Sequence, residues 1–507
     1  MNIAARVAGL LARLLPTPGI RRLFVACTVV TVLTLLARMP FVLAPGMSTD
    51  SYAYLDGWPT FEQLAGQGRF GQFLVFKLFG ALAIDPLAFA TLLQGVGLAV
   101  FAFTAPLLFA GFASPEQNRL IPICLAGLVV TLHPYAAEIL TFSEASFTAL
   151  LATAMGIASI FIVARRARWW WLASVMLIVA LSMYQVLINY AALMILFGFL
   201  QIYLRVGRFR GAVREEYRPL LRSCLVLVGS VLAYLILHKA LVALTGATEV
   251  SRAGLLPIGN VGARLHDIAA LGGFLWDRSL LVTYGTAAKA LLWGMAIAGW
   301  AFLLVRLLAR PSAGVVLPLV VVALVPVAAL GVVSVAAVWW PAPRVLGGIV
   351  AVWAMGVYWF AWFVNGRLGR LLVLAAAAML LVGFTAVGHR VHSDQLQLNA
   401  FDRLLAQRVY DELIRLDTYN DQTPVVVVNR RLSWSHPLPL ASAWMDLNLT
   451  AFADKRAIKG LLQLSNGRTL HVVLPDSADT RQCEALPAWP DTGFAVARSS
   501  GDVLVCL

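Results

Sequence analysis

Residues 23–44 read LFVACTVVTVLTLLARMPFVLA, and residues 45–80, directly behind them, read PGMSTDSYAYLDGWPTFEQLAGQGRFGQFLVFKLFG. The first segment is long enough to form a helix across a hydrocarbon core about 30 Å thick. It is too long and too poorly flanked for a cleavable signal peptide. The second stretch is the first polar run, with three carboxylates (Asp50, Asp56 and Glu62) interleaved with aromatic residues. It therefore predicts a loop at the membrane surface that carries chemistry.

The composition points to a membrane protein throughout. Of 507 residues, 60% are hydrophobic and 13% are charged, which is far more apolar than a soluble globular chain. The net charge of +14 would suggest a nucleic-acid partner if it were clustered on a soluble domain. Most of this charge lies in short loops between apolar spans, so we expect the lipid bilayer as a partner and no nucleic acid.

The apolar segments predict an α-helical polytopic protein with about eleven transmembrane helices. The predicted spans lie at about 22–44, 86–112, 120–140, 145–164, 169–204 (two spans), 223–244, 286–305, 315–338, 345–364 and 371–388. Arginine-rich connections, such as those at Arg165 and Arg166 or at Arg205, fall in alternate loops. Because positive loops stay in the cytoplasm, we expect a cytoplasmic amino terminus and a carboxyl-terminal part outside the cytoplasm.

The composition changes near His389, which divides the chain into two predicted domains. Residues 1–388 form the transmembrane domain, with the first outer loop at 45–85. Residues 389–507 form a small α/β domain, with an amphipathic helix over 395–417 and strands near 424–429, 470–474 and 503–506. We expect Cys483 and Cys506 to form a disulfide, since both fall in the outer domain, where thiols that meet become oxidised.

Several motifs are absent from the sequence. It contains no Walker loop, no dinucleotide-binding glycine pattern after a strand, no His-Glu-x-x-His and no Gly-x-Ser-x-Gly. His389, His392 and Asp394 have a spacing compatible with a metal, but we interpret them as a polar patch beside the membrane. We therefore predict no metal and no cofactor.

Two outer carboxylates are candidates for catalysis. Asp50 follows a Pro-Gly exit from the first span and lies in a small-residue bend flanked by aromatics. Catalytic groups collect on loops held by a rigid scaffold. Glu144 is the alternative, because the second outer loop can bring it to the same place; it can equally be a residue that starts the next helix.

Positive charges that break the topology pattern form a second set. They are Arg38, Arg69, Lys77, Lys239, Lys289 and Arg344, which lie at or near the outer interface. Long cationic side chains can snorkel to the surface, but such groups also suit a lipid phosphate. Arg69 and Arg344 are the first candidates for phosphate binding, with Lys77 and Lys239 behind them.

Several short segments together resemble a known family. They are Asp50-Ser-Tyr-Ala-Tyr-Leu55, Gly68-Arg-Phe-Gly71, the outer segment from His133-Pro-Tyr135 to Ser143-Glu144, Leu181-Ser-Met-Tyr-Gln185, Pro343-Arg-Val-Leu346 and Cys483–Pro490. All resemble the Gtr-type glucosyltransferases that modify bacterial O-antigen lipopolysaccharide. Members look like the GT-C class, polytopic enzymes that take a sugar from a polyprenyl-phosphate carrier with an acidic residue in the first outer loop.

The resemblance implies a multi-pass glucosyltransferase of the bacterial inner membrane with a periplasmic carboxyl-terminal domain. It would move a sugar from a polyprenyl-phosphate donor to a surface glycan at the periplasmic face. Asp50 would be the general base, with Glu144 as its rival. Tyr52, Tyr54, Trp58 and Asp56 would bind the sugar. Two alternatives stay open: a transporter or flippase of lipid-linked sugars, and a non-enzymatic partner in glycan assembly.

Overall fold

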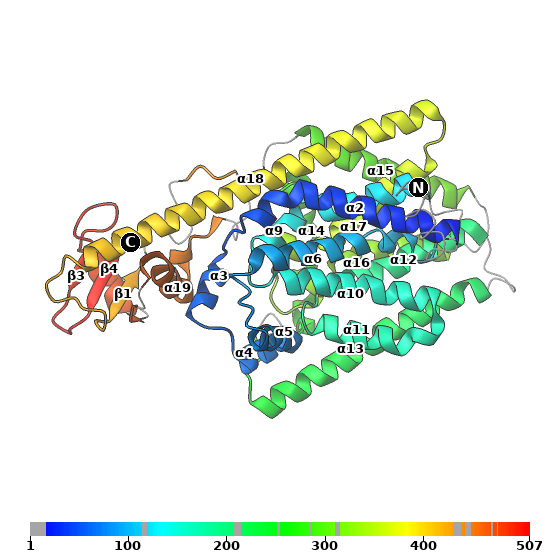
Figure 1. Cartoon of the computed structure of the whole chain (residues 1–507). Helices are drawn as coiled ribbons and strands as arrows, with labels where there is room; N and C mark the ends of the chain where they lie inside the picture. Colours follow the sequence, from blue (N-terminus) through cyan, green and yellow to red (C-terminus); the bar gives the residue numbers. More distant parts are fainter. Residues whose placement is uncertain are drawn as a thin grey trace, which may run out of the picture.

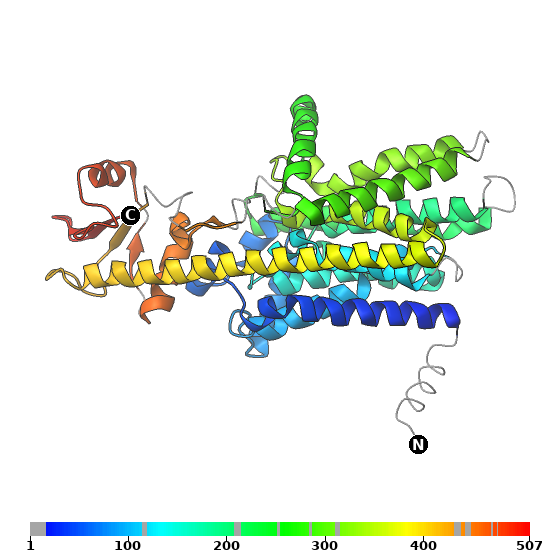
Figure 2. The same cartoon turned by 90° about the horizontal axis from the view of Figure 1, so that it is seen from above.

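The computed structural model describes residues 17–113, 119–206, 214–250, 254–282, 286–309, 315–429, 438–441, 448–467, 470–473 and 475–507. It is a bundle of long helices from which one helix, α18, runs out to a small sheet (Figure 1). The helix α2 begins at the end of the bundle far from that sheet, and the short helices α3, α4 and α5 lie at the near end (Figures 1 and 2).

Eight helices in the described part of the chain are long and apolar enough to cross a membrane. They are α2 (Pro18–Leu43), α6 with α7 (Ala90–Thr104 and Leu107–Ala110), α10 (Ser146–Arg165), α12 (Leu187–Val206), α13 (Arg214–Thr245), α15 (Thr286–Leu308), α16 (Val316–Val335) and α18 (Arg367–Leu413). A ninth span is possible if α8 (Leu120–Leu132) and α9 (Pro134–Leu140), which are bent by 49°, count as one. The chain is a polytopic membrane protein.

Two shorter apolar helices run within the same bundle. They are α11 (Trp170–Leu181), preceded by a short helical turn at Ala167–Trp169, and α17 (Gly347–Phe363). Each predicted apolar segment therefore has a helical counterpart. Eleven spans require both short helices to cross the bilayer, so that number stays a prediction.

Short helices line the end of the bundle nearest the sheet. They are α3 (Thr49–Asp56), α4 (Phe61–Gly66), α5 (Phe70–Ala81) and α14 (Val261–Arg278), with single turns at Ile258–Asn260 and Pro343–Val345. The predicted first outer loop is thus largely helical.

The helix α18 corrects one expectation. A separate amphipathic helix over 395–417 was predicted after the last span, but Arg367–Leu413 is one unbroken helix of 47 residues. Its polar middle is matched by partners: His389 Nε2 lies 2.7 Å from the Ala37 oxygen, and the His392 ring packs on Phe41 at 4.5 Å. These polar residues are helix-packing contacts, so nothing forces the helix to end there.

The carboxyl-terminal sheet has four strands in the order β2-β1-β4-β3. They are β1 (Val425–Val428), β2 (Val472–Val473), β3 (Ala495–Ala497) and β4 (Val503–Cys506). The central strand β1 is parallel to β2 and β4, while β3 is antiparallel to β4.

Both faces of β1 and β4 are buried, as expected of parallel strands made of consecutive apolar residues. One face packs on α18 and α19 (Lys455–Asn466), and the other lies over α20 (Ser477–Glu484). Cys483 of α20 is bonded to Cys506 of β4 in the structure, with Cα atoms 5.5 Å apart.

Candidate active site

The helix α3 positions Asp50. Ser48 and Ser51 cap each other across its first turn, because the Ser48 hydroxyl accepts from the Ser51 amide and the Ser51 hydroxyl accepts from the Ser48 amide, both at 3.1 Å. Gly57, with φ +157°, ends the helix. Asp50 lies in the first turn, where the helix N-terminus favours a negative charge.

The chain that leads into α3 is held from two sides. The Met47 amide donates to Asn399 Oδ1 at 2.8 Å, and the Met47 oxygen accepts from Gln395 and Asn399 of α18 at 2.5 and 2.7 Å. The Ser143 hydroxyl donates to the Gly46 oxygen at 2.5 Å. The position of Asp50 is therefore fixed by α18 and by the segment that precedes α10.

Glu144 meets α3 beside Asp50. Its side chain is buried, with 4% exposed, and its Oε2 accepts a hydrogen bond from the Ser51 hydroxyl at 2.5 Å. Burial and, after it, the nearby charge of Asp50 raise the pKa of Glu144 to about 8, against the opposing effects of the Ser51 hydrogen bond and the Arg344 charge. Asp50 and Glu144, predicted as alternatives, therefore form one acid pair, in which Glu144 holds a proton at neutral pH.

Tyr54 lies between this pair and the surrounding cations. Burial raises the pKa of its phenol, Glu144 and Asp50 raise it further, and Arg69 and Arg456 oppose them. Two acids and two arginines thus lie within electrostatic reach of one hydroxyl. Arg456 belongs to α19 and was not among the residues predicted for the site.

Arg344 is held by a buried acid that was not nominated for the site. Its Nη1 lies 2.6 Å from Glu138 Oε1, and its amide donates to Glu138 Oε2 at 2.5 Å. The guanidinium stands over the Phe142 ring at 4.5 Å, and the Tyr184 hydroxyl donates to the Arg344 oxygen at 2.9 Å. Arg344 therefore ties the turn before α17 to α9, close enough to Glu144 to lower its pKa.

Arg69 stands at the start of α5. Its backbone amide donates to the Leu64 oxygen at 2.7 Å, and the preceding residues are anchored by Gln185, which donates to the Gln67 oxygen at 3.1 Å. The Tyr234 hydroxyl donates to the Gly68 oxygen at 3.0 Å. The half-buried side chain of Arg69 is thus placed by helices α11 to α13 rather than by its own loop alone.

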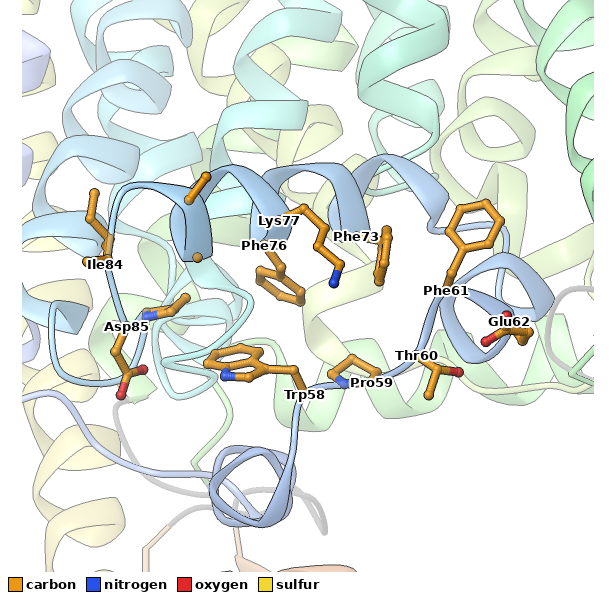
Figure 3. Close-up of a pocket in the computed structure, with 14 residues that line it drawn as sticks. Trp58, Pro59, Thr60, Phe61, Glu62, Phe73, Phe76, Lys77, Ile84 and Asp85 are labelled. Carbon is orange, nitrogen blue, oxygen red and sulfur yellow. The ribbon is translucent and has the colours of Figure 1, made fainter.

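A groove of about 920 Å³ lies between α5 and the segment that leads into α4 (Figure 3). Its lining includes Trp58, Phe61, Phe73, Phe76, Lys77 and Asp85. Trp58 projects from the segment before α4 towards Phe76 and Lys77 of α5, and the Lys77 ammonium lies 5.2 Å from the centre of the Phe73 ring.

This groove shares a wall with the acid pair. The Tyr54 ring contacts the Trp58 ring at 5.1 Å and the Phe76 ring at 6.0 Å. On the outer side of α5, Leu74, Leu78 and Leu82 form an exposed stripe. A helix with such a stripe and a lysine suits the membrane interface.

Three predicted ligands lie elsewhere. Tyr52 is 1% exposed in the apolar cluster beneath the sheet, which is incompatible with stacking on a sugar. Asp56 pairs with Lys459 of α19 at 2.5 Å, and the exposed Lys239 pairs with Glu249 at 2.6 Å. Asp56 therefore serves the contact between α3 and α19, and nothing draws Lys239 towards the acid pair.

Two other cations that break the topology pattern, Arg38 and Lys289, also have structural contacts. Arg38 is fully buried and donates to the Leu132 and His133 oxygens, and Lys289 donates to the Asp277 oxygen at 3.3 Å. Among the described residues, no group of three or more histidine, cysteine or acidic side chains could hold a metal ion.

Comparison with known proteins identifies the family of the chain. No curated protein is significantly similar to the chain. A family model described as glucosyl transferase GtrII matches residues 22–358, a region that contains Asp50, Glu144, Arg69 and Arg344. The chain therefore belongs to the GtrII glucosyltransferase family and is a glycosyltransferase.

Proposed function

We propose that this enzyme moves glucose from a polyprenyl-phosphate carrier to a surface glycan such as O-antigen, at the periplasmic face of the inner membrane. The observation that carries the proposal is the Asp50–Glu144 pair. Ser51, next to Asp50, donates a hydrogen bond to Glu144, and both acids lie at the end of the helix bundle nearest the sheet. A GT-C type enzyme needs an acid at that interface, where a lipid-linked donor presents its phosphate.

Asp50 is the general base. It is half-exposed, whereas Glu144 is buried, so only Asp50 can touch an acceptor hydroxyl. Asp50 takes the hydroxyl proton as the acceptor oxygen bonds to C1 of the donor sugar, and the bond from C1 to the phosphate oxygen breaks. The carrier phosphate leaves with the electron pair of that bond.

Glu144 keeps the pair at a single negative charge. Two carboxylates at close range cannot both ionise readily, and the proton stays on the buried member.

Arg69 is the strongest candidate for the carrier phosphate, and Arg344 supports it. Arg344 is 19% exposed and already neutralises Glu138, so part of its charge is committed. Lys77 and Trp58 line the groove beside Tyr54, where a lysine can meet the headgroup and aromatic rings can stack on a sugar. Tyr54 and Trp58 are thus the retained sugar ligands.

The proposal is tested with Asp50→Asn, Glu144→Gln and the control Asp277→Asn, which alters an exposed outer acid. Purified proteins receive polyprenyl-phosphate glucose and a candidate glycan, and glucose transfer is measured. Loss of a general base typically costs roughly 10²- to 10⁴-fold, so Asp50→Asn should show that loss while the control stays active.

Three results would contradict the proposal. Near-normal turnover of Asp50→Asn with an inactive Glu144→Gln would make Glu144 the base. Movement of the lipid-linked sugar across vesicles without transfer would instead indicate a flippase. Saturable glycan binding alone would indicate a non-enzymatic assembly partner.

A further inference from the structure

The helix α19 rests directly on α3. A Cβ atom at Gly460 would lie 1.9 Å from the Tyr52 oxygen and 3.0 Å from the Leu55 Cβ, so only glycine allows this approach. Lys459 pairs with Asp56 at the end of α3. Two adjacent residues of α19 thus lock it to the helix that carries Asp50.

This packing brings the first turn of α19 towards the acid pair. Asp454 caps α19 by accepting from the Arg456 amide at 2.9 Å. The Arg456 guanidinium lies within electrostatic reach of Asp50 and Tyr54, although about 400 residues separate them in the chain. Arg69 acts on the same Tyr54 hydroxyl from α5.

Most of the Arg456 side chain is open to solvent. Its side chain is 72% exposed, and one nitrogen lies 3.3 Å from Asp454 Oδ2. An exposed ion pair of this kind contributes little to stability. Several N–H groups therefore remain open to an anion, and a guanidinium binds phosphate oxygens in pairs.

We propose that Arg456 binds the phosphate of the lipid-linked donor, so that the carboxyl-terminal part of the chain supplies a ligand to the active site. This inference rests on the proposed function, because it assigns the donor phosphate of that reaction. Arg69 and Arg456 then approach the phosphate from α5 and α19, on either side of the residues that hold Asp50. The leaving group gains charge as its bond to C1 breaks, and these cations stabilise that charge.

The test compares Arg456→Ala, Arg456→Lys and the control Arg415→Ala. Arg415 is also exposed and paired within one helical turn, with Glu412 at 2.8 Å. Binding of polyprenyl monophosphate and of the uncharged polyprenol is measured on the full-length protein in nanodiscs. The donor KM and kcat are measured in parallel, with melting temperatures as a check on folding.

Arg456→Ala should weaken polyprenyl monophosphate binding and raise the donor KM by roughly 10- to 100-fold, which is the range for a hydrogen bond to a charged group. Arg456→Lys should recover part of the loss, since the charge remains but the paired geometry does not. Polyprenol binding and the control should not change.

Two results would overturn the inference while leaving the proposed function intact. Equal phosphate affinity in Arg456→Ala and Arg415→Ala would remove Arg456 from the phosphate site. A lower kcat with unchanged KM and binding would show that Arg456 acts on Asp50 instead. If the unmodified protein bound no polyprenyl monophosphate at all, the proposed function itself would fail.

Discussion

One hydroxyl, that of Ser51, ties the buried Glu144 to the helix that carries Asp50. Ser51 is at once a helix cap and the donor to Glu144, so the start of α3 and the buried carboxyl are fixed together. Asp50→Asn removes the half-exposed carboxylate, whereas Glu144→Gln replaces a buried acid that already holds a proton, so the two variants should behave differently.

Stability should depend on pH through Glu144. When unfolded, this acid ionises near its ordinary value of 4.5, whereas the folded pKa is about 8, because of burial and then the charge of Asp50. Between these values the folded state binds a proton that the unfolded state has lost, so rising pH favours unfolding, and the effect levels off above about 8. The melting temperature in detergent should therefore fall from pH 5 to pH 8, less steeply in Glu144→Gln. Identical slopes in both proteins would contradict the assignment.

Arg344 should matter for folding as well as for substrate. Arg344→Ala leaves the fully buried Glu138 without its cation, and breaking a buried pair typically costs about 3–5 kcal/mol. Adding Glu138→Gln to the same protein should restore much of the free energy of unfolding. Lys239→Ala, which breaks an exposed pair, should cost less than about 1 kcal/mol in the same denaturation assay. An equally small effect for Arg344→Ala would show that Glu138 does not depend on it.

Residue identity predicted part of the site. Asp50 and Glu144 could be nominated because acids are conspicuous where an apolar chain leaves a membrane. The cap formed by Ser48 and Ser51 follows a recognisable local spacing, which could have drawn attention to Ser51. Arg456 and Glu138 could not be assigned, because their roles depend on partners hundreds of residues away.

At the scale of elements, the break between α8 and α9 shapes the site. Pro134 starts α9, and the bend leaves the last carbonyls of α8 without helical partners. Arg38 of α2 donates to the Leu132 oxygen at 2.7 Å and the His133 oxygen at 3.1 Å. A cation at a helix C-terminus is favourable, so Arg38 holds the bend from which α9 presents Glu138.

Arg38→Met should destabilise the protein. Methionine has a similar length but cannot donate a hydrogen bond, so the buried Leu132 and His133 oxygens lose their donor. The expected loss is about 1–3 kcal/mol, seen as a lower melting temperature in detergent. Arg166→Met, at an exposed position behind α10, serves as the control. Transfer activity should fall in Arg38→Met more than in the control. An unchanged melting temperature would mean that water or another donor satisfies these carbonyls.

Helices and strands were predicted best where a single local property of the sequence determines them. Hydrophobic length located the helices at each predicted span, since each must bury a continuous run in lipid, but it missed the apolar helix α5 within the predicted first outer loop. The continuity of α18 could not be predicted, because its polar middle looks like an end until His389 and Gln395 meet their partners on α2 and the first loop. Strand β3, only three residues long, has too little pattern to identify.

At the scale of the whole molecule, the arginine-rich connections predict which side of the membrane each end of the bundle faces. The sheet and α3 lie at one end of the bundle, and α2 begins at the other (Figure 1). If all eleven helices cross the bilayer, the two ends of the chain lie on opposite sides.

A reporter active only in the cytoplasm should be silent when fused after Leu507. The same reporter fused after Leu308, at the end of α15 beside Arg306, should be active, because that basic connection is expected inside. Immunoblots establish that both fusions are present in equal amounts. Strong activity after Leu507 would reverse the orientation and place the acid pair in the cytoplasm.

The unbroken helix α18 also has a mechanical meaning. At 1.5 Å per residue its 47 residues span about 70 Å, of which a bilayer core takes about 30 Å. The remainder extends beyond the bundle to the sheet. Its Gln395 and Asn399 side chains donate hydrogen bonds to the Met47 oxygen in the loop before Asp50. Because α18 has no break, the sheet and α19 cannot swing away from α3 as a hinged unit. Whatever reaches Asp50 must do so while Gly460 and Lys459 stay in contact with α3.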